Sequence, residues 1–102
     1  MKLQREDRNG IGVIRCLDER LDAIVAVQFK DQFRDLTDEQ TQRYVLDMSQ
    51  VKFMDSSGLG AVVAVYKFLG RERKFGIAGL TATVARVFKL TRMDSVFTIH
   101  ET

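Results

Sequence analysis

The sequence predicts one α/β domain built on a small mixed sheet, with the element order β-β-α-β-α-β-α-β. The chain has 102 residues, 45% of them hydrophobic, and this length suits one domain because two would each bury too little apolar surface. Short apolar runs alternate with segments of helical periodicity, which predicts right-handed crossovers and a mostly parallel sheet core. We therefore treat residues 1–102 as a single domain.

The N-terminal part predicts a hairpin and then a helix. Residues 1–7 form a weak, charged strand suited to a sheet edge, and residues 11–17 form the return strand. Between them, Asn9-Gly10 is a strong tight-turn signal because both residues tolerate positive φ. Residues 22–36 are expected to be helical, since four apolar residues recur on one face. This face carries Val25, Phe29, Phe33 and Leu36.

The remaining elements alternate between strands and helices. Residues 44–48 form a short apolar strand, compatible with a central position buried on both faces. A helix apolar on nearly every side then runs to about Leu69, and Thr81 can cap a third helix. Strands are expected at 74–79 and 95–100. The phenylalanines expected in the core are Phe29, Phe33, Phe53, Phe68, Phe75 and Phe88.

Composition excludes several classes of function. A net charge of +2 is too small to predict nucleic-acid binding. The one cysteine, Cys16, permits neither an internal disulfide nor a structural zinc site and is expected in the core. The one histidine, His100, lies near the C-terminus and removes most histidine-based catalysis. No apolar signal segment or membrane-spanning run is present, so a cytoplasmic location and no membrane partner are expected.

Basic residues gather in the second half of the chain, most densely at Lys67, Arg71, Arg73 and Lys74. Their place at the expected end of a helix suits them to complement the helix dipole. The alternative is that they form a surface for an acidic partner.

The loop Asp55-Ser56-Ser57-Gly58-Leu59-Gly60 concentrates small and polar residues at a helix start. It lacks the glycine two places before a serine that a nucleophile elbow requires. It also lacks a Walker lysine and the third glycine of a dinucleotide loop. One of the two serines is expected to cap the helix. The helix start favours an anion, and a phosphate on serine would add about −1.5 to −2 charges there.

Two segments carry a family resemblance. Val45-Leu46-Asp47-Met48-Ser49, then Val51, Phe53, Met54 and Asp55-Ser56-Ser57-Gly58-Leu59-Gly60, closely resemble the signature of STAS domains. The likeness is to the stand-alone anti-sigma factor antagonists of bacterial partner-switching systems, and it covers essentially the whole chain. Leu21-Asp22 resembles the family's Leu-Asp pair before the first helix, although Glu19 stands where family members often have glycine.

The resemblance implies a small mixed STAS fold and a mechanism. The unphosphorylated antagonist binds an anti-sigma factor that is also a serine kinase of the histidine-kinase-like ATPase fold, and this frees a sigma factor or another client. The kinase then phosphorylates and releases the antagonist, and a serine phosphatase resets the cycle. Ser56 maps to the phosphate acceptor, and Ser57 to a helix cap or helper. Asp22 maps to the aspartate near the phosphorylation surface, where it is also a candidate helix N-cap.

We therefore expect a transcription regulator that binds a partner and is not an enzyme. The expected partner-binding residues are Asp22, Asp55, Ser56, Ser57, Gly58, Leu59 and Gly60. No cofactor, metal, nucleic acid or membrane is expected as a partner, and the protein should be a monomer or weak dimer. The alternatives are a non-switching accessory subunit of a transporter or signalling scaffold, and nucleotide binding at the 58–60 loop.

Overall fold

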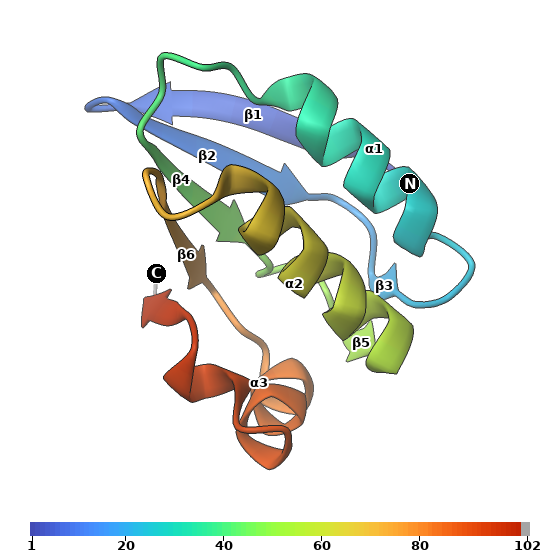
Figure 1. The fold of residues 1–102 in the computed structure, drawn as a ribbon. Coiled ribbons are helices and arrows are strands. Elements are labelled where there is room, and N and C mark those ends of the chain that lie inside the picture. Colours follow the sequence, from blue (N-terminus) through green and yellow to red (C-terminus); the bar gives the residue numbers. More distant parts are fainter. Residues whose placement is uncertain (101–102) are drawn as a thin grey trace.

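A five-stranded mixed sheet with the order β1-β2-β4-β6-β7 forms the centre of the computed structural model, which describes residues 1–100 (Figure 1). Strand β1 is antiparallel to β2, and the other neighbouring pairs are parallel. The expected mixed α/β fold is confirmed. The strands are β1 (Leu3–Arg8), β2 (Ile11–Cys16), β4 (Arg43–Asp47), β6 (Lys74–Ala78) and β7 (Thr98–His100). At the hairpin turn Asn9 and Gly10 have φ values of 53° and 80°, as their sequence predicts.

Two helices pack on the main sheet, and a third lies outside it. Helices α1 (Ala26–Leu36) and α2 (Ser56–Leu69) lie side by side over the same face, and α3 (Ala82–Leu90) lies beyond the end of β6 (Figure 1). A 3-10 turn, η1 (Met93–Ser95), follows α3 and delays the last strand, which is therefore shorter than expected. The Thr81 hydroxyl precedes α3 but donates to the Val51 carbonyl at 2.8 Å instead of capping the helix.

A second, two-stranded sheet is present that the sequence pattern does not predict. Strands β3 (Arg20–Leu21) and β5 (Phe53–Met54) pair in parallel. Strands of two residues are too short to show a hydrophobic period, so the sequence pattern gives no sign of them. Their pairing joins the segment before α1 to the segment before α2. It therefore brings Asp22 and Ala23 close to Asp55 and the start of α2.

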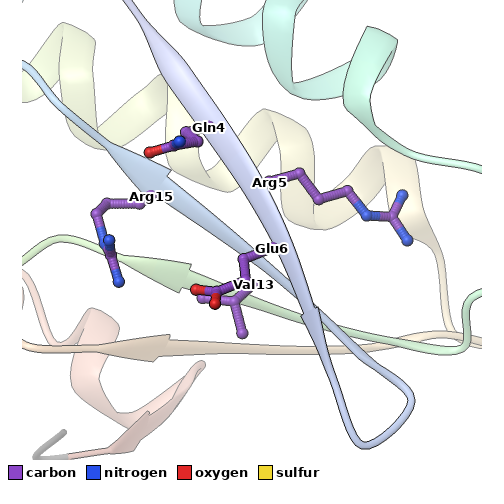
Figure 2. Close-up of a pocket in the computed structure, with 5 residues that line it drawn as sticks. All are labelled: Gln4, Arg5, Glu6, Val13 and Arg15. Atoms are coloured by element: carbon purple, nitrogen blue, oxygen red, sulfur yellow. The ribbon is translucent and has the colours of Figure 1, made fainter.

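The main sheet is covered by helices on one face only, so the expectation that its central strand is buried on both faces is wrong. In β4, Tyr44 is buried while Val45 is only half-buried. The other face holds shallow hollows, one of about 310 Å³ over the β1–β2 hairpin (Figure 2). In that view Arg5 points away from the other four labelled residues. Its guanidinium donates to the Leu36 carbonyl at 2.6 Å.

Aromatic rings fill the space between helices and sheet. The Phe33 ring lies 6.1 Å from Phe29, 6.4 Å from Tyr44 and 5.9 Å from Phe75 between ring centroids. Two other phenylalanines are not in the core, contrary to expectation, because they lie on outward surfaces. Phe53 is 39% exposed in the small sheet, and Phe68 is 45% exposed on α2. Helix α2 is therefore not buried on every side.

Removing the central aromatic ring should destabilise the fold far more than removing an outer one. We expect Phe33→Ala to lower the free energy of unfolding by about 3–5 kcal/mol, because it leaves a cavity among packed rings. Phe53→Ala, the matched control, should cost about 1 kcal/mol or less, since its ring contacts solvent and the Arg20 guanidinium. Urea unfolding measures both, and equal losses would contradict this description of the core.

Candidate functional site

Asp55 caps helix α2. Its backbone is extended, and its Oδ1 accepts a hydrogen bond from the Gly58 backbone N–H at 2.9 Å. This satisfies one of the amides that a helix start leaves without an intrahelical partner. The expectation that a serine caps this helix is therefore wrong, because the aspartate one place earlier occupies the capping position.

The same carboxylate also contacts the segment before α1. Asp55 Oδ2 accepts from the Ala23 backbone N–H at 3.2 Å, so one side chain joins the approaches to two helices. Asp22 does not cap α1, contrary to expectation, because Val25 is the N-cap residue and the helix starts later. Instead, Asp22 Oδ1 accepts from the Ile24 N–H at 3.1 Å and shapes the turn that presents Ala23 to Asp55.

Ser56 and Ser57 occupy the first turn of α2 with exposed side chains. Because Asp55 already supplies the cap, neither hydroxyl is needed to hold the helix. No acidic residue follows Asp55 in this first turn, but the Asp55 carboxylate itself lies at the positive end of the helix dipole. The two hydroxyls beside it remain exposed and accessible to a partner.

Residues 56–60 were expected to form a loop before the helix, but they are the first residues of α2, and their two glycines have different surroundings. Gly58 is buried, and a Cβ added there would run into the Leu21 carbonyl, so only glycine lets α2 approach β3 this closely. Leu59 is also buried. A Cβ on Gly60 would meet nothing within 4 Å. Of the residues expected to bind a partner, Gly58 and Leu59 therefore lie inside the domain and shape the loop, while Gly60 lies open.

Hydrogen bonds hold the Asp55 carboxylate in its charged form. The Gly58 N–H is the main cause of a lowered pKa for Asp55, and the Ala23 N–H contributes further. Backbone donors favour the ionised form because they stabilise its charge. At neutral pH the loop therefore carries a fixed negative charge directly before Ser56.

Two exposed apolar side chains, for which the sequence predicts no role, lie beside residues 55–60. Ile24 is 85% exposed, and Val27 is also well exposed at the start of α1. Ile24 directly follows Ala23, whose amide donates to Asp55. An exposed apolar edge next to a polar loop is typical of a surface that binds protein. The sequence held a sign of this edge, because Ile24 and Val27 are apolar but do not belong to the helix face that carries Phe29 and Phe33.

A metal site, a membrane-spanning helix or a pocket at residues 55–60 would each indicate a different class of function. Over residues 1–100, no three His, Cys, Asp or Glu side chains gather as metal ligands would. Within the same range, no helix has the length and apolar character needed to cross a membrane. The hollows on the uncovered face of the sheet are lined by residues of the strands and the hairpin turn and do not include residues 55–60.

Known proteins resemble this chain over nearly its whole length. A family model described as STAS domain matches residues 2–102. The anti-sigma-F factor antagonist RsfB of Mycobacterium tuberculosis is 27% identical over 96 residues, covering 94% of this chain and 78% of RsfB. The crystal structure of an anti-sigma factor antagonist from Mycobacterium paratuberculosis has a TM-score of 0.88 at 27% identity, covering 99% and 86% of the two chains. The phosphorylated form of the Bacillus cell fate determinant SpoIIAA has a TM-score of 0.66 at 20% identity, covering 99% and 92%.

The two glycines should respond to alanine in opposite ways. Gly58→Ala should lower the free energy of unfolding by about 1–3 kcal/mol, because the new methyl group forces α2 away from β3. Gly60→Ala, the matched control in the same helix, should raise it by up to about 1 kcal/mol through better helix propensity. Urea unfolding tests both, and a neutral Gly58→Ala would contradict the close approach.

The cap should also make stability depend on pH. Because folding lowers the pKa of Asp55, its contribution is complete above the ordinary carboxyl value of 3.8 and is lost as pH falls through the lowered value. Asp55→Asn should therefore be less stable than wild type at neutral pH, with a difference that shrinks in acid. Thermal unfolding between pH 2 and pH 7 measures this, and a pH-independent difference would argue against a charged cap.

Proposed function

The chain belongs to the STAS domain family, and from this we propose that it is an anti-sigma factor antagonist switched by phosphorylation of Ser56. The observation that carries the proposal is the exposed Ser56 hydroxyl at the start of a helix that Asp55 already caps. The names of its relatives support the antagonist role. The phosphorylated form known for SpoIIAA, a protein of the same fold, supports the switch.

The proposed binding surface is the edge where α1 and α2 begin. Asp55, Ser56, Ser57 and Gly60 supply its polar, low-lying part, with Asp22 shaping the neighbouring turn. Ile24 and Val27 supply its apolar part. The proposed partner is an anti-sigma factor that is also a serine kinase of the histidine-kinase-like ATPase fold. Binding to this surface frees the client of that anti-sigma factor.

The proposed switch works through charge. In the partner's active site the Ser56 Oγ attacks the γ-phosphorus of ATP, ADP leaves, and the partner takes up the hydroxyl proton. The product adds about −1.5 to −2 charges beside the Asp55 carboxylate. The helix start tolerates this anion, but a partner surface shaped for a neutral hydroxyl does not, so the complex dissociates. A serine phosphatase restores the hydroxyl.

In this proposal the protein is a bacterial, cytoplasmic binding protein, and its partners supply the catalysis. It requires only a rigid sheet, an accessible hydroxyl and a surface that a phosphate alters.

A negative charge at position 56 should weaken binding, whereas loss of the Ser56 hydroxyl should not. We expect Ser56→Ala to bind the cognate anti-sigma factor kinase about as tightly as wild type, and Ser56→Asp to bind at least about ten-fold more weakly. Calorimetry with the purified kinase and a nucleotide measures both. Ser57→Asp, one position along, is the control for added charge alone, and it should weaken binding less.

The acceptor itself can be identified directly. After incubation with kinase and ATP, mass spectrometry should find one phosphate on Ser56 of the wild type and none on Ser56→Ala. Phosphate on Ser57 alone would overturn the assignment. Equal binding by wild type and Ser56→Asp would instead favour a non-switching accessory role.

A further inference from the structure

We propose that a second binding surface, on the outer side of α1 and α2 around Phe68, takes an acidic peptide segment of a protein partner. The Phe68 groove is a hollow of about 210 Å³ between the two helices, lined by Lys30, Arg34, Ala64, Val65 and Phe68. Its lining residues lie in the middle and later turns of both helices, whereas Ser56 is the first residue of α2. A helix rises about 1.5 Å per residue, which separates Ser56 from Phe68 by roughly 18 Å.

Phe68 is an exposed aromatic ring set between two cations. The guanidinium carbons of Arg34 and Arg73 each lie 5.9 Å from the centre of its ring. Nearly half of this side chain remains open to solvent, so the groove offers an apolar contact surrounded by positive charge. An aromatic ring flanked by arginines is the composition that interface centres favour.

Arg73 is held in place without losing its charge. Its guanidinium donates to the Asp38 carbonyl at 2.8 Å and to the Leu69 carbonyl at 3.3 Å, and neither partner is a carboxylate. The side chain is therefore ordered, and its net positive charge remains for a ligand. A cation already fixed in position loses less conformational entropy on binding.

The Arg34 guanidinium can exchange its present carboxylate for one from a partner. It pairs with Asp31 at 3.1 Å, and both side chains are more than half exposed. A surface ion pair of this kind contributes little, because water screens it. A partner carboxylate can therefore replace Asp31 at little cost, and two parallel hydrogen bonds to guanidinium are a strong form of such a contact.

Further cations extend the positive surface past the end of α2. Lys67, Arg71 and Lys74 are exposed, and within residues 1–100 none of them pairs with a carboxylate. Glu72 is the one acidic residue among them in the sequence. Complementing the helix dipole explains cations at the end of α2, but it does not explain Lys30 and Arg34 on α1, nor the exposed ring between the helices.

The shape and charge together select the occupant. A furrow between two helices fits a peptide segment that places one apolar side chain on Phe68 and carboxylates on Arg34, Arg73 and Lys30. The acidic Asp31 beside the groove and the small net charge of the chain disfavour nucleic acid, whose phosphates need a continuous basic face. The proposal stands independently of the Ser56 switch, because the two surfaces share no residue.

A titration of the full chain tests the groove. The probe is a 12-residue peptide of Glu, Asp and Leu, and the control peptide replaces each carboxylate by its amide. In NMR spectra the acidic peptide should shift the amide signals of residues 30, 34, 68 and 73 saturably, and the amide peptide should not. Phe68→Ala and Arg34→Glu should each weaken binding about ten-fold.

Three controls make the outcome decisive. Arg8→Glu changes an exposed arginine on the hairpin and should leave binding unchanged. Ser56→Asp should also leave it unchanged, so a failed switch and a failed groove give different results. Thermal unfolding checks that Phe68→Ala is folded. Shifts spread evenly over all basic residues, equal binding of the amide peptide, or preferential binding of anionic vesicles or single-stranded DNA to the groove would each overturn the proposal.

Discussion

One carboxylate, that of Asp55, organises the end of the molecule that holds the candidate site. Asp55 accepts from Gly58 in α2 and from Ala23 in the turn before α1, so it fixes two helix starts relative to each other. The β3–β5 pair brings the two segments close enough for this, and Gly58 permits the final approach to Leu21. Because the aspartate carries the capping role, the neighbouring serines keep exposed hydroxyls.

This division of roles separates the groups that stabilise the fold from those of the proposed switch. The rings around Phe33 and the helix-covered face of the sheet hold the fold, while the site depends on groups at its edge. A phosphate on Ser56 would therefore change the charge of the surface without removing a contact that the fold requires. In the proposed cycle the partners carry out the phosphorylation and dephosphorylation. A short chain with one cysteine and one histidine therefore needs no catalytic groups of its own to act as a switch.

Much of the fold could be predicted from the sequence, because the spacing of apolar residues and the residue preferences of tight turns are local properties. The face of α1 and the Asn9-Gly10 turn have clear patterns, and the structure confirms them. The β3–β5 pair could not be predicted, since two-residue strands form only through tertiary approach. The sequence predicts a loop over residues 55–60 with a serine as the helix cap, whereas residues 56–60 already belong to α2 and Asp55 is the cap. That choice depends on backbone geometry at Asp55, which capping preferences alone do not resolve because Asp and Ser are both good caps.

The most direct test of this account is amide hydrogen exchange at Ala23 and Gly58, measured by NMR in wild type, Ser56→Ala and Asp55→Ala. If Asp55 alone ties the two helix starts, both amides should exchange faster in Asp55→Ala and keep their wild-type rates in Ser56→Ala. If Ser56→Ala instead exposes these amides as much as Asp55→Ala does, the serine is part of the cap. Its hydroxyl would then not be free to act as a switch.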